Sequence, residues 1–94
     1  GSRLLHTFSI EPGRDLGARS VIVVYKPTDG IPHAGTTFAG YLGLLSGLNA
    51  ESISISALQV PNGNGNAPGM AGPILARQVL AQAKTLPAAV SSID

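Results

Sequence analysis

Five consecutive residues, Val21-Ile22-Val23-Val24-Tyr25, constrain the fold of this chain more than any other segment. Valine, isoleucine and tyrosine favour extended backbone, and a run without polar alternation is typical of a strand that is buried on both faces. Pro27 follows closely and ends the strand, because proline lacks the amide hydrogen that pairing requires. The run therefore predicts a strand in a sheet that is covered on both sides.

Three further segments are predicted to be strands. Residues 4–10 are rich in residues that favour strands, and residues 36–45 are assigned to a strand in which glycines permit a bend or the close approach of another backbone. Residues 52–56 alternate serine and isoleucine, which places the isoleucines on one face of the sheet and the serines on the other. A hairpin connection is expected at residues 47–50.

The last third of the chain predicts helices. Pro73 suits the first position of a helix, and Leu75, Val79 and Ala83 then form one apolar stripe. Thr85 is expected to cap a second, shorter helix over residues 86–93. Together these elements predict an α+β fold, with a mostly antiparallel sheet of about four strands followed by two helices.

The chain is interpreted as a single domain or a fragment of a larger one. Residues 1–2 resemble the remnant of an expression tag, residues 3–60 form the sheet region, residues 61–72 a loop rich in glycine and asparagine, and residues 73–93 the helices.

Charge and cysteine content restrict the function. Charged residues make up 12% of the 94 residues, against about 25% in an average soluble domain, while hydrophobic residues reach 44%. Such a chain has few groups to cover an exposed surface, so we expect self-association or a partner chain. No basic cluster indicates nucleic acid, and no apolar run is long enough for a membrane span of about 20 residues. With no cysteine, the chain has neither thiolate metal ligands nor a cysteine nucleophile.

The residues themselves do not assemble an active site. His6 and Glu11 lie five positions apart on a predicted strand, so their side chains are expected on opposite faces. His33 follows a proline in a predicted turn, where it is expected to contact solvent. Two isolated histidines do not make a metal site, and Pro68 interrupts the one segment that begins like a dinucleotide motif, so no cofactor is expected.

An ordered series of residues between Val21 and Gln59 nevertheless resembles a known family. The series consists of Pro27 and Gly30, then Ala39-Gly40 and Gly43, then Gly47-Leu48-Asn49 and Ser52-Ile53-Ser54. It is similar to the N-terminal-nucleophile hydrolases related to isopenicillin N acyltransferase, a group that includes bile-salt (choloylglycine) hydrolases and penicillin V acylases. The helical tail from Gly72 to Val90 also resembles that family, so the match covers roughly residues 4–93.

The resemblance implies part of an αββα sandwich and the hydrolysis of a C–N bond in an N-acyl substrate. In the family an N-terminal cysteine attacks the amide carbonyl, and a hairpin asparagine helps to bind the oxyanion. Asn49 matches that asparagine, although it is equally interpreted as a residue that adopts the left-handed conformation of its turn. Glu11 stands in place of the family's aspartate, Phe8 in place of its arginine, and Ser52 in place of a glycine.

Two functions follow as hypotheses. The chain is a fragment or subunit of an amide hydrolase, inactive alone and completed by a second chain that carries the nucleophile. Alternatively, it is a non-catalytic remnant that acts as a self-associating structural module. A binder of small molecules on the sheet face is a third, weaker reading.

Overall fold

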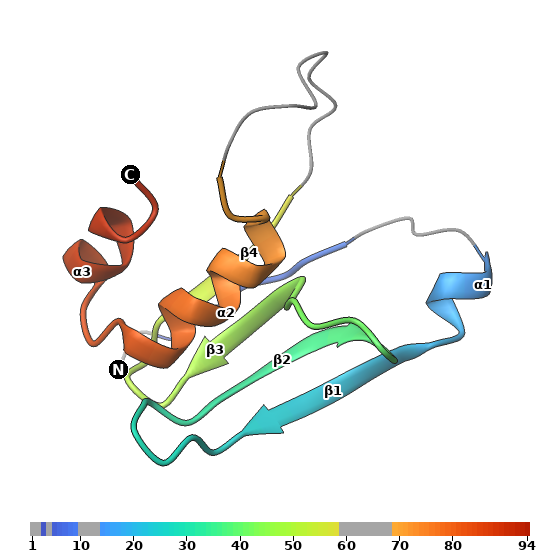
Figure 1. Ribbon diagram of the computed structural model, residues 1–94, viewed down its shortest axis with the longest axis horizontal. Coiled ribbons are helices and arrows are strands. Elements are labelled where there is room, and N and C mark those ends of the chain that lie inside the picture. The colour runs from blue at the N-terminus through green and yellow to red at the C-terminus, as the bar shows by residue number, and fades with distance from the viewer. Residues whose placement is uncertain (1–2, 4, 10–13, 59–68) are drawn as a thin grey trace.

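The computed structural model describes residues 3, 5–9, 14–58 and 69–94. The elements are α1 (Arg14–Gly17), β1 (Ser20–Tyr25), β2 (His33–Phe38), β3 (Ser46–Asn49), β4 (Ser54–Ser56), α2 (Gly72–Gln82) and α3 (Leu86–Ser91). The four strands form one antiparallel sheet in the order β1-β2-β3-β4, and the two longer helices follow it (Figure 1). The predicted α+β class and the order of sheet and helices are confirmed.

Helix α2 lies across one face of the sheet, over β3 and β4 (Figure 1). Pro73 stands in its first turn, as predicted, and its apolar stripe buries Ala76, Val79 and Leu80. Ile53 and Ile55 pack against the core that Val79 forms with Ala83 and Ala89, whereas the serines of β4 point to the opposite face. The alternation over Ser54–Ser56 therefore gives the predicted two-faced strand, but the predicted bounds of 52–56 are wrong, since Ser52, with φ of 65°, and Ile53 precede β4.

The second helix begins where the sequence predicted. Ala88 N donates to Thr85 Oγ1 at 3.3 Å, so Thr85 caps α3, which ends two residues before the predicted end, at Ser91. Because Ala89 is buried against α2 and Leu86 is exposed, this short helix is held by one side only.

The predicted strand over residues 36–45 is wrong in its bounds. Strand β2 begins earlier and ends at Phe38; a turn follows in which Gly40 has φ of 84°, and β3 starts at Ser46. Leu44, between the two strands, is fully buried, and its N–H donates to Pro73 O at 2.8 Å. The expected hairpin at residues 47–50 is displaced as well, since Gly47 and Leu48 lie in β3 and the turn follows Asn49.

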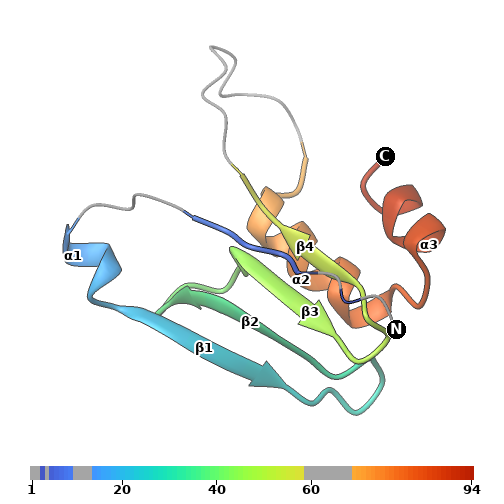
Figure 2. The same ribbon diagram turned by 180° about the vertical axis from the view of Figure 1, so that it is seen from behind.

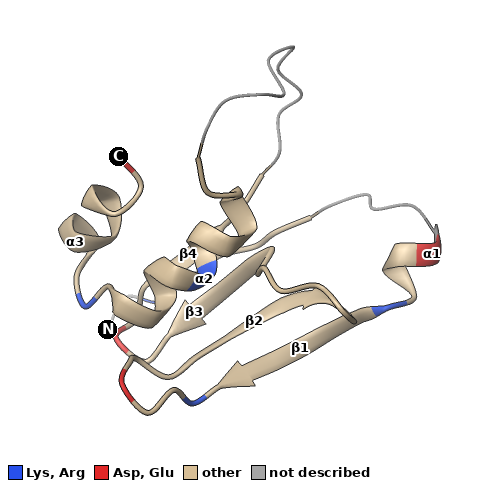
Figure 3. Cartoon of the chain, viewed as in Figure 1, with Lys and Arg blue, Asp and Glu red and all other residues tan. Residues whose placement is uncertain are grey.

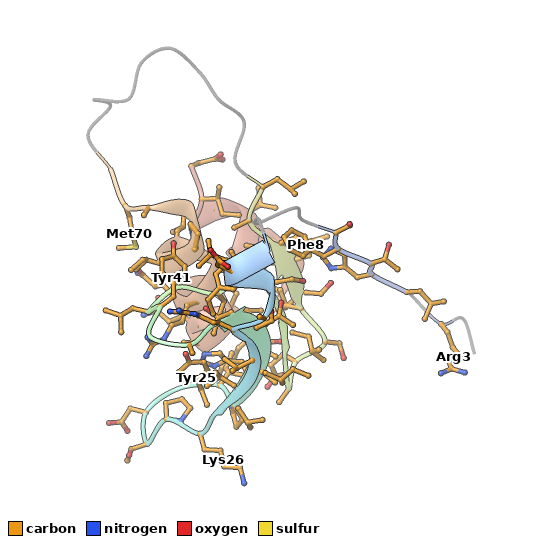
Figure 4. All side chains as sticks on the ribbon, turned by 90° about the vertical axis from the view of Figure 1, so that its right-hand side faces the viewer. Arg3, Phe8, Tyr25, Lys26, Tyr41 and Met70 are labelled. Atoms are coloured by element: carbon orange, nitrogen blue, oxygen red, sulfur yellow. The ribbon has the colours of Figure 1, made fainter. Side chains whose placement is uncertain are left out.

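The first predicted strand is also not formed. Residues 5–9 belong to no strand, and the positions 4 and 10 of that prediction lie outside the described residues. Figure 4 shows this segment, with Arg3 and Phe8 labelled, on the side of the sheet opposite the helices. The single-turn helix α1 precedes β1. Most of the predicted glycine- and asparagine-rich loop, residues 59–68, lies outside the described part of the chain.

The prediction that β1 is buried on both faces is wrong. Strand β1 is the first strand of the sheet, and α2 packs on β3 and β4 rather than on it. Ile22 and Val24 are 76% and 64% exposed on the face away from the helices. Figure 2 views the sheet from this uncovered side. The β-branched run thus correctly predicts a strand, but the described residues supply a cover for one face of the sheet only.

Charged residues stay out of the sheet. None of the four strands contains a lysine, arginine, aspartate or glutamate, and the charges that Figure 3 colours lie at the ends of strands, in connections and on helices. The uncovered face is therefore neutral.

Candidate functional site

Asn49, the predicted oxyanion donor, ends β3 and is 97% buried, with 3% of its surface exposed. Its Nδ2 donates to Leu80 O at 3.0 Å and to Ala83 O at 2.8 Å. Leu80 lies in the last turn of α2 and Ala83 caps the helix, where carbonyls lack partners within the helix. Asn49 therefore ties the end of α2 to the sheet.

The carbonyl oxygen of the same side chain holds the β3–β4 turn. Asn49 Oδ1 accepts hydrogen bonds from Glu51 N at 3.1 Å and Ile53 N at 2.9 Å. With two donated and two accepted bonds, the hydrogen-bonding capacity of the amide is filled. An oxyanion donor role stays a prediction, and it requires that an amide hydrogen leave Leu80 or Ala83.

The alternative reading, a left-handed Asn49, is wrong. Among the described residues other than glycine, positive φ is found at Ser52, with φ of 65°. This is the position where the resembled family usually has glycine, the residue that adopts such a conformation at least cost. Glu11, the second predicted site residue, lies outside the described residues.

The uncovered sheet face carries exposed apolar residues and a shallow hollow. Ile22, Val24 and Leu48 are 76%, 64% and 59% exposed there, and the register places them on the same face of the sheet, on β1 and β3, with β2 between. The hollow has a volume of about 230 Å³ and is lined in part by Ile22, Ala34 and Leu48. Its polar margin includes His6 and Ser54.

His6 meets two serines of β4 on this face. Its Nδ1 lies 2.9 Å from Ser54 Oγ, and its Nε2 lies 2.8 Å from Ser56 Oγ. The expectation that His6 lies on a strand is wrong, and the position of its side chain relative to Glu11 falls outside the described residues. The period-two serines signalled a polar row, but nothing in the sequence linked that row to a histidine 48 residues away.

His33 was expected in a turn at the surface and is instead buried on the helix-covered face of β2, 5% exposed. Its ring stacks on Tyr25 with centroids 4.9 Å apart, and Arg77 lies over the same Tyr25 ring at 4.5 Å. His33 Nδ1 donates to Ile31 O at 2.8 Å, while Nε2 has no hydrogen-bond partner among the described residues. The guanidinium of Arg77, from α2, therefore packs on a side chain of β1.

A second, larger hollow of about 1070 Å³ lies between the turn after β2 and the start of α2. Its lining is mainly apolar and includes Phe38, Tyr41, Leu45, Leu58, Leu75 and Ile93. It brings together no acid–base pair of the described residues, so it offers a binding surface rather than a reaction centre.

No family model matches this chain, and no curated protein or solved structure does either. The family resemblance thus rests on the residues quoted above. Within the part of the chain that the structure describes, no helix has the length and apolar character that crossing a membrane requires. In the same part, no three histidine, aspartate or glutamate side chains gather as metal ligands would.

Proposed function

We propose that this chain is one layer of an N-terminal-nucleophile amide hydrolase, which a second polypeptide carrying the nucleophile completes. The observation that carries the proposal is the sheet itself, with helices on one face and exposed Ile22, Val24 and Leu48 on the other. Such a face suits the packing of a second sheet, as in an αββα sandwich, and burying each of these side chains would contribute about 1.5–3 kcal/mol. The glycine-like conformation of Ser52 supports the proposal, because it falls where the resembled family has glycine.

In the completed enzyme the second polypeptide supplies an N-terminal cysteine. Its thiolate attacks the carbonyl of an N-acyl substrate, and its own α-amino group takes up the proton. The present chain contributes the covered sheet and the fixed turn around Asn49. It has no cysteine, so alone it is inactive in this reaction.

Isolation from its source tests this proposal directly. The chain is expected to purify with a second polypeptide whose N-terminal residue is cysteine by mass spectrometry. The complex is expected to hydrolyse an N-acyl amide and to lose this activity after alkylation with iodoacetamide. A 9.5 kDa monomer with no second polypeptide would contradict the proposal, unless the gene encodes the cysteine upstream of Arg3.

A lysine on the uncovered face is expected to weaken the assembly. Leu48→Lys places a charge where the second sheet would pack, and burying an unpaired charge costs several kcal/mol, so affinity should fall about 100-fold or more. The matched control is Leu86→Lys on α3, where the replaced leucine is also exposed, at 67% against 59% for Leu48. Light scattering after size-exclusion chromatography measures both. If both lysines weaken the assembly equally, the uncovered sheet face is not the interface with the second polypeptide.

Self-association is the second candidate function, and the outer edge of β1 favours it. Ala39 N donates to Arg19 O at 2.9 Å, so Arg19 and Ala39 form a hydrogen-bonded pair. The next pair in the β1–β2 register is Ser20 with Phe38, which is therefore a non-hydrogen-bonded pair. Hydrogen-bonded and non-bonded pairs alternate in antiparallel strands, so the N–H groups of Ile22 and Val24 point outward. Such an edge can pair with a second copy.

Val24→Pro tests that edge without breaking the sheet. Proline removes an outward amide hydrogen while leaving the β1–β2 hydrogen bonds intact. If copies associate through β1, the variant should be monomeric at concentrations where the unaltered chain and Val24→Ala are dimeric, with circular dichroism showing that the fold is retained. Sedimentation velocity makes the comparison. A dimer that persists in Val24→Pro excludes the β1 edge as its interface.

A further inference from the structure

The contact between His6, Ser54 and Ser56 has the composition of a nucleophile, a base and an orienting group. Ser54 and Ser56 lie two residues apart on β4, so both hydroxyls point to the uncovered face. The imidazole of His6 bridges them, at 2.9 Å through Nδ1 and at 2.8 Å through Nε2. Figure 2 shows the segment that carries His6 passing by β4 on this side of the sheet.

The direction of the hydrogen bonds distinguishes the two serines. With the Ser56 hydroxyl hydrogen assigned to Ser46 Oγ, which lies 3.1 Å away, Ser56 Oγ accepts from His6 at Nε2. A neutral imidazole with its hydrogen on Nε2 has its lone pair on Nδ1, where Ser54 Oγ lies. Ser54 is therefore the serine whose hydroxyl hydrogen faces a base, and Ser56 fixes the tautomer of that base.

The surroundings of Ser54 fit an acyl group. Ser54 borders the hollow of about 230 Å³, in which Ile22, Ala34 and Leu48 offer an apolar wall. The bond from Asn49 N to Ile53 O sets the alternation of pairs between β3 and β4, so the N–H of Ser54 points to the outer edge of β4. There it is available to donate to a carbonyl oxygen that becomes negative during attack.

We propose that His6 and Ser54 form a serine–histidine dyad that hydrolyses esters of short apolar acids. Ser54 Oγ bonds to the ester carbonyl carbon while its proton passes to His6 Nδ1. The bond from the carbonyl carbon to the alcohol oxygen breaks, and the alcohol leaves with that proton. Water then attacks the acyl-serine by the same route, releasing the acid and restoring the Ser54 hydroxyl. Ser56 is a positioning residue, since it acts through His6.

The dyad is independent of the amide-hydrolase proposal, because it uses a serine of this chain rather than a cysteine of another. A second sheet packed on the uncovered face would cover Ser54. The ester hydrolysis thus belongs to the chain on its own, which is the sample that tests it.

The first test is the hydrolysis of p-nitrophenyl butyrate by the full chain. Ser54→Ala and His6→Gln are each expected to lower kcat/KM by about 100-fold or more, the usual contribution of an acid–base group or above it. The matched control is Ser20→Ala, which removes an exposed hydroxyl of β1 on the same uncovered face of the sheet. It should leave kcat/KM unchanged. Hydrolysis that survives in Ser54→Ala, with circular dichroism showing a folded chain, would overturn the proposal.

A second test does not depend on any variant folding. An alkyl fluorophosphonate should label the unaltered chain once, at Ser54, as peptide mass spectrometry can show. Labelling of another residue, or none, would overturn the dyad. The role of Ser56 has its own signature: long-range ¹⁵N–¹H NMR correlations should place the His6 hydrogen on Nε2, and Ser56→Ala should abolish this preference. A tautomer unchanged in Ser56→Ala rules out that role.

Discussion

Replacement of Asn49 by alanine is expected to reduce the free energy of unfolding by about 3–5 kcal/mol, since each buried polar group left without a partner costs about 1–3 kcal/mol. The substitution leaves two carbonyls, of Leu80 and Ala83, and two amides, of Glu51 and Ile53, without the bonds that Asn49 now makes. The carbonyls and amides belong to different elements, α2 and the β3–β4 turn, so the loss separates helix from sheet. Small domains have only about 5–15 kcal/mol in total.

Urea denaturation followed by circular dichroism measures this change. The control is Leu48→Ala at the neighbouring position, where the side chain is 59% exposed. This substitution should lower the free energy of unfolding by less than about 1 kcal/mol. Equal losses at the two positions would show that the four hydrogen bonds do not hold the structure. A folded Asn49→Ala chain of normal stability that fails only to support amide hydrolysis in the complex would instead favour the oxyanion role.

Asn49→Asp sharpens the same prediction through its pH dependence. The new side chain can still accept from Glu51 N and Ile53 N, but its other oxygen faces the carbonyls of Leu80 and Ala83 at the negative end of α2. Burial and these carbonyls should raise the pKa of the introduced carboxyl above its unfolded value of about 3.9. The folded chain then binds the proton more tightly than the unfolded chain. The free energy of unfolding of Asn49→Asp is therefore highest below the unfolded pKa, and it falls as the pH rises from there through the higher pKa of the folded chain.

Local pattern was sufficient for the elements that a single periodicity defines. The stripe of α2, the cap at Thr85 and the two faces of Ser54–Ser56 follow from local side-chain pattern along one helix or strand, and the structure has all three. The prediction of one strand over residues 36–45 is wrong because this glycine-containing stretch combines the end of β2 with the partly buried connection that leads to β3. Its central Leu44 is as apolar as a strand residue but is buried by contact with Pro73, which is 29 positions away.

The site residues depended on contacts that no spacing encodes. Asn49 reaches carbonyls more than 30 positions away, and His6 reaches serines about 50 positions away. His33 was placed at the surface because Pro32 precedes it, yet Tyr25 and the register of β1 with β2 bury its ring. The motif comparison singled out Asn49, but its partners became evident only once α2 was placed on the sheet.

The exposed side of β1 connects these results to the proposals. A run as apolar as Val21–Tyr25 predicted cover on both faces, and the described residues cover one. A second layer packed on Ile22 and Val24 would bury the other face of β1, as the apolar run predicts. The same uncovered face holds the Ser54 hydroxyl and its base, so the state of assembly decides whether the hydroxyl can meet a substrate.

Gly47→Val is expected to reduce the free energy of unfolding by about 3 kcal/mol or more, at the upper end of what an inserted side chain costs in a packed core. A Cβ on Gly47 would lie 2.6 Å from Ala34 O and 2.8 Å from Leu80 Cδ1. The first atom belongs to the paired backbone of β2 and the second to a fully buried side chain of α2. Ala34 O cannot move without disturbing the pairing of β2 with β3, whereas Leu80 Cδ1 is the end of a buried side chain that would have to repack under α2. The absence of a side chain at Gly47 therefore lets Leu80 pack closely against the sheet.

The control for Gly47 is Gly72→Ala at the start of α2, where a Cβ meets no atom within 4 Å. That change should be neutral or stabilise the chain by up to about 1 kcal/mol, because alanine restricts the unfolded backbone. A double-mutant cycle of Gly47→Ala with Leu80→Ala separates the two contacts: the shortened side chain should relieve the clash with α2 and leave the one with Ala34 O. Urea midpoints for the four chains give the coupling energy. Strict additivity would mean that the close approach of α2 does not depend on Gly47.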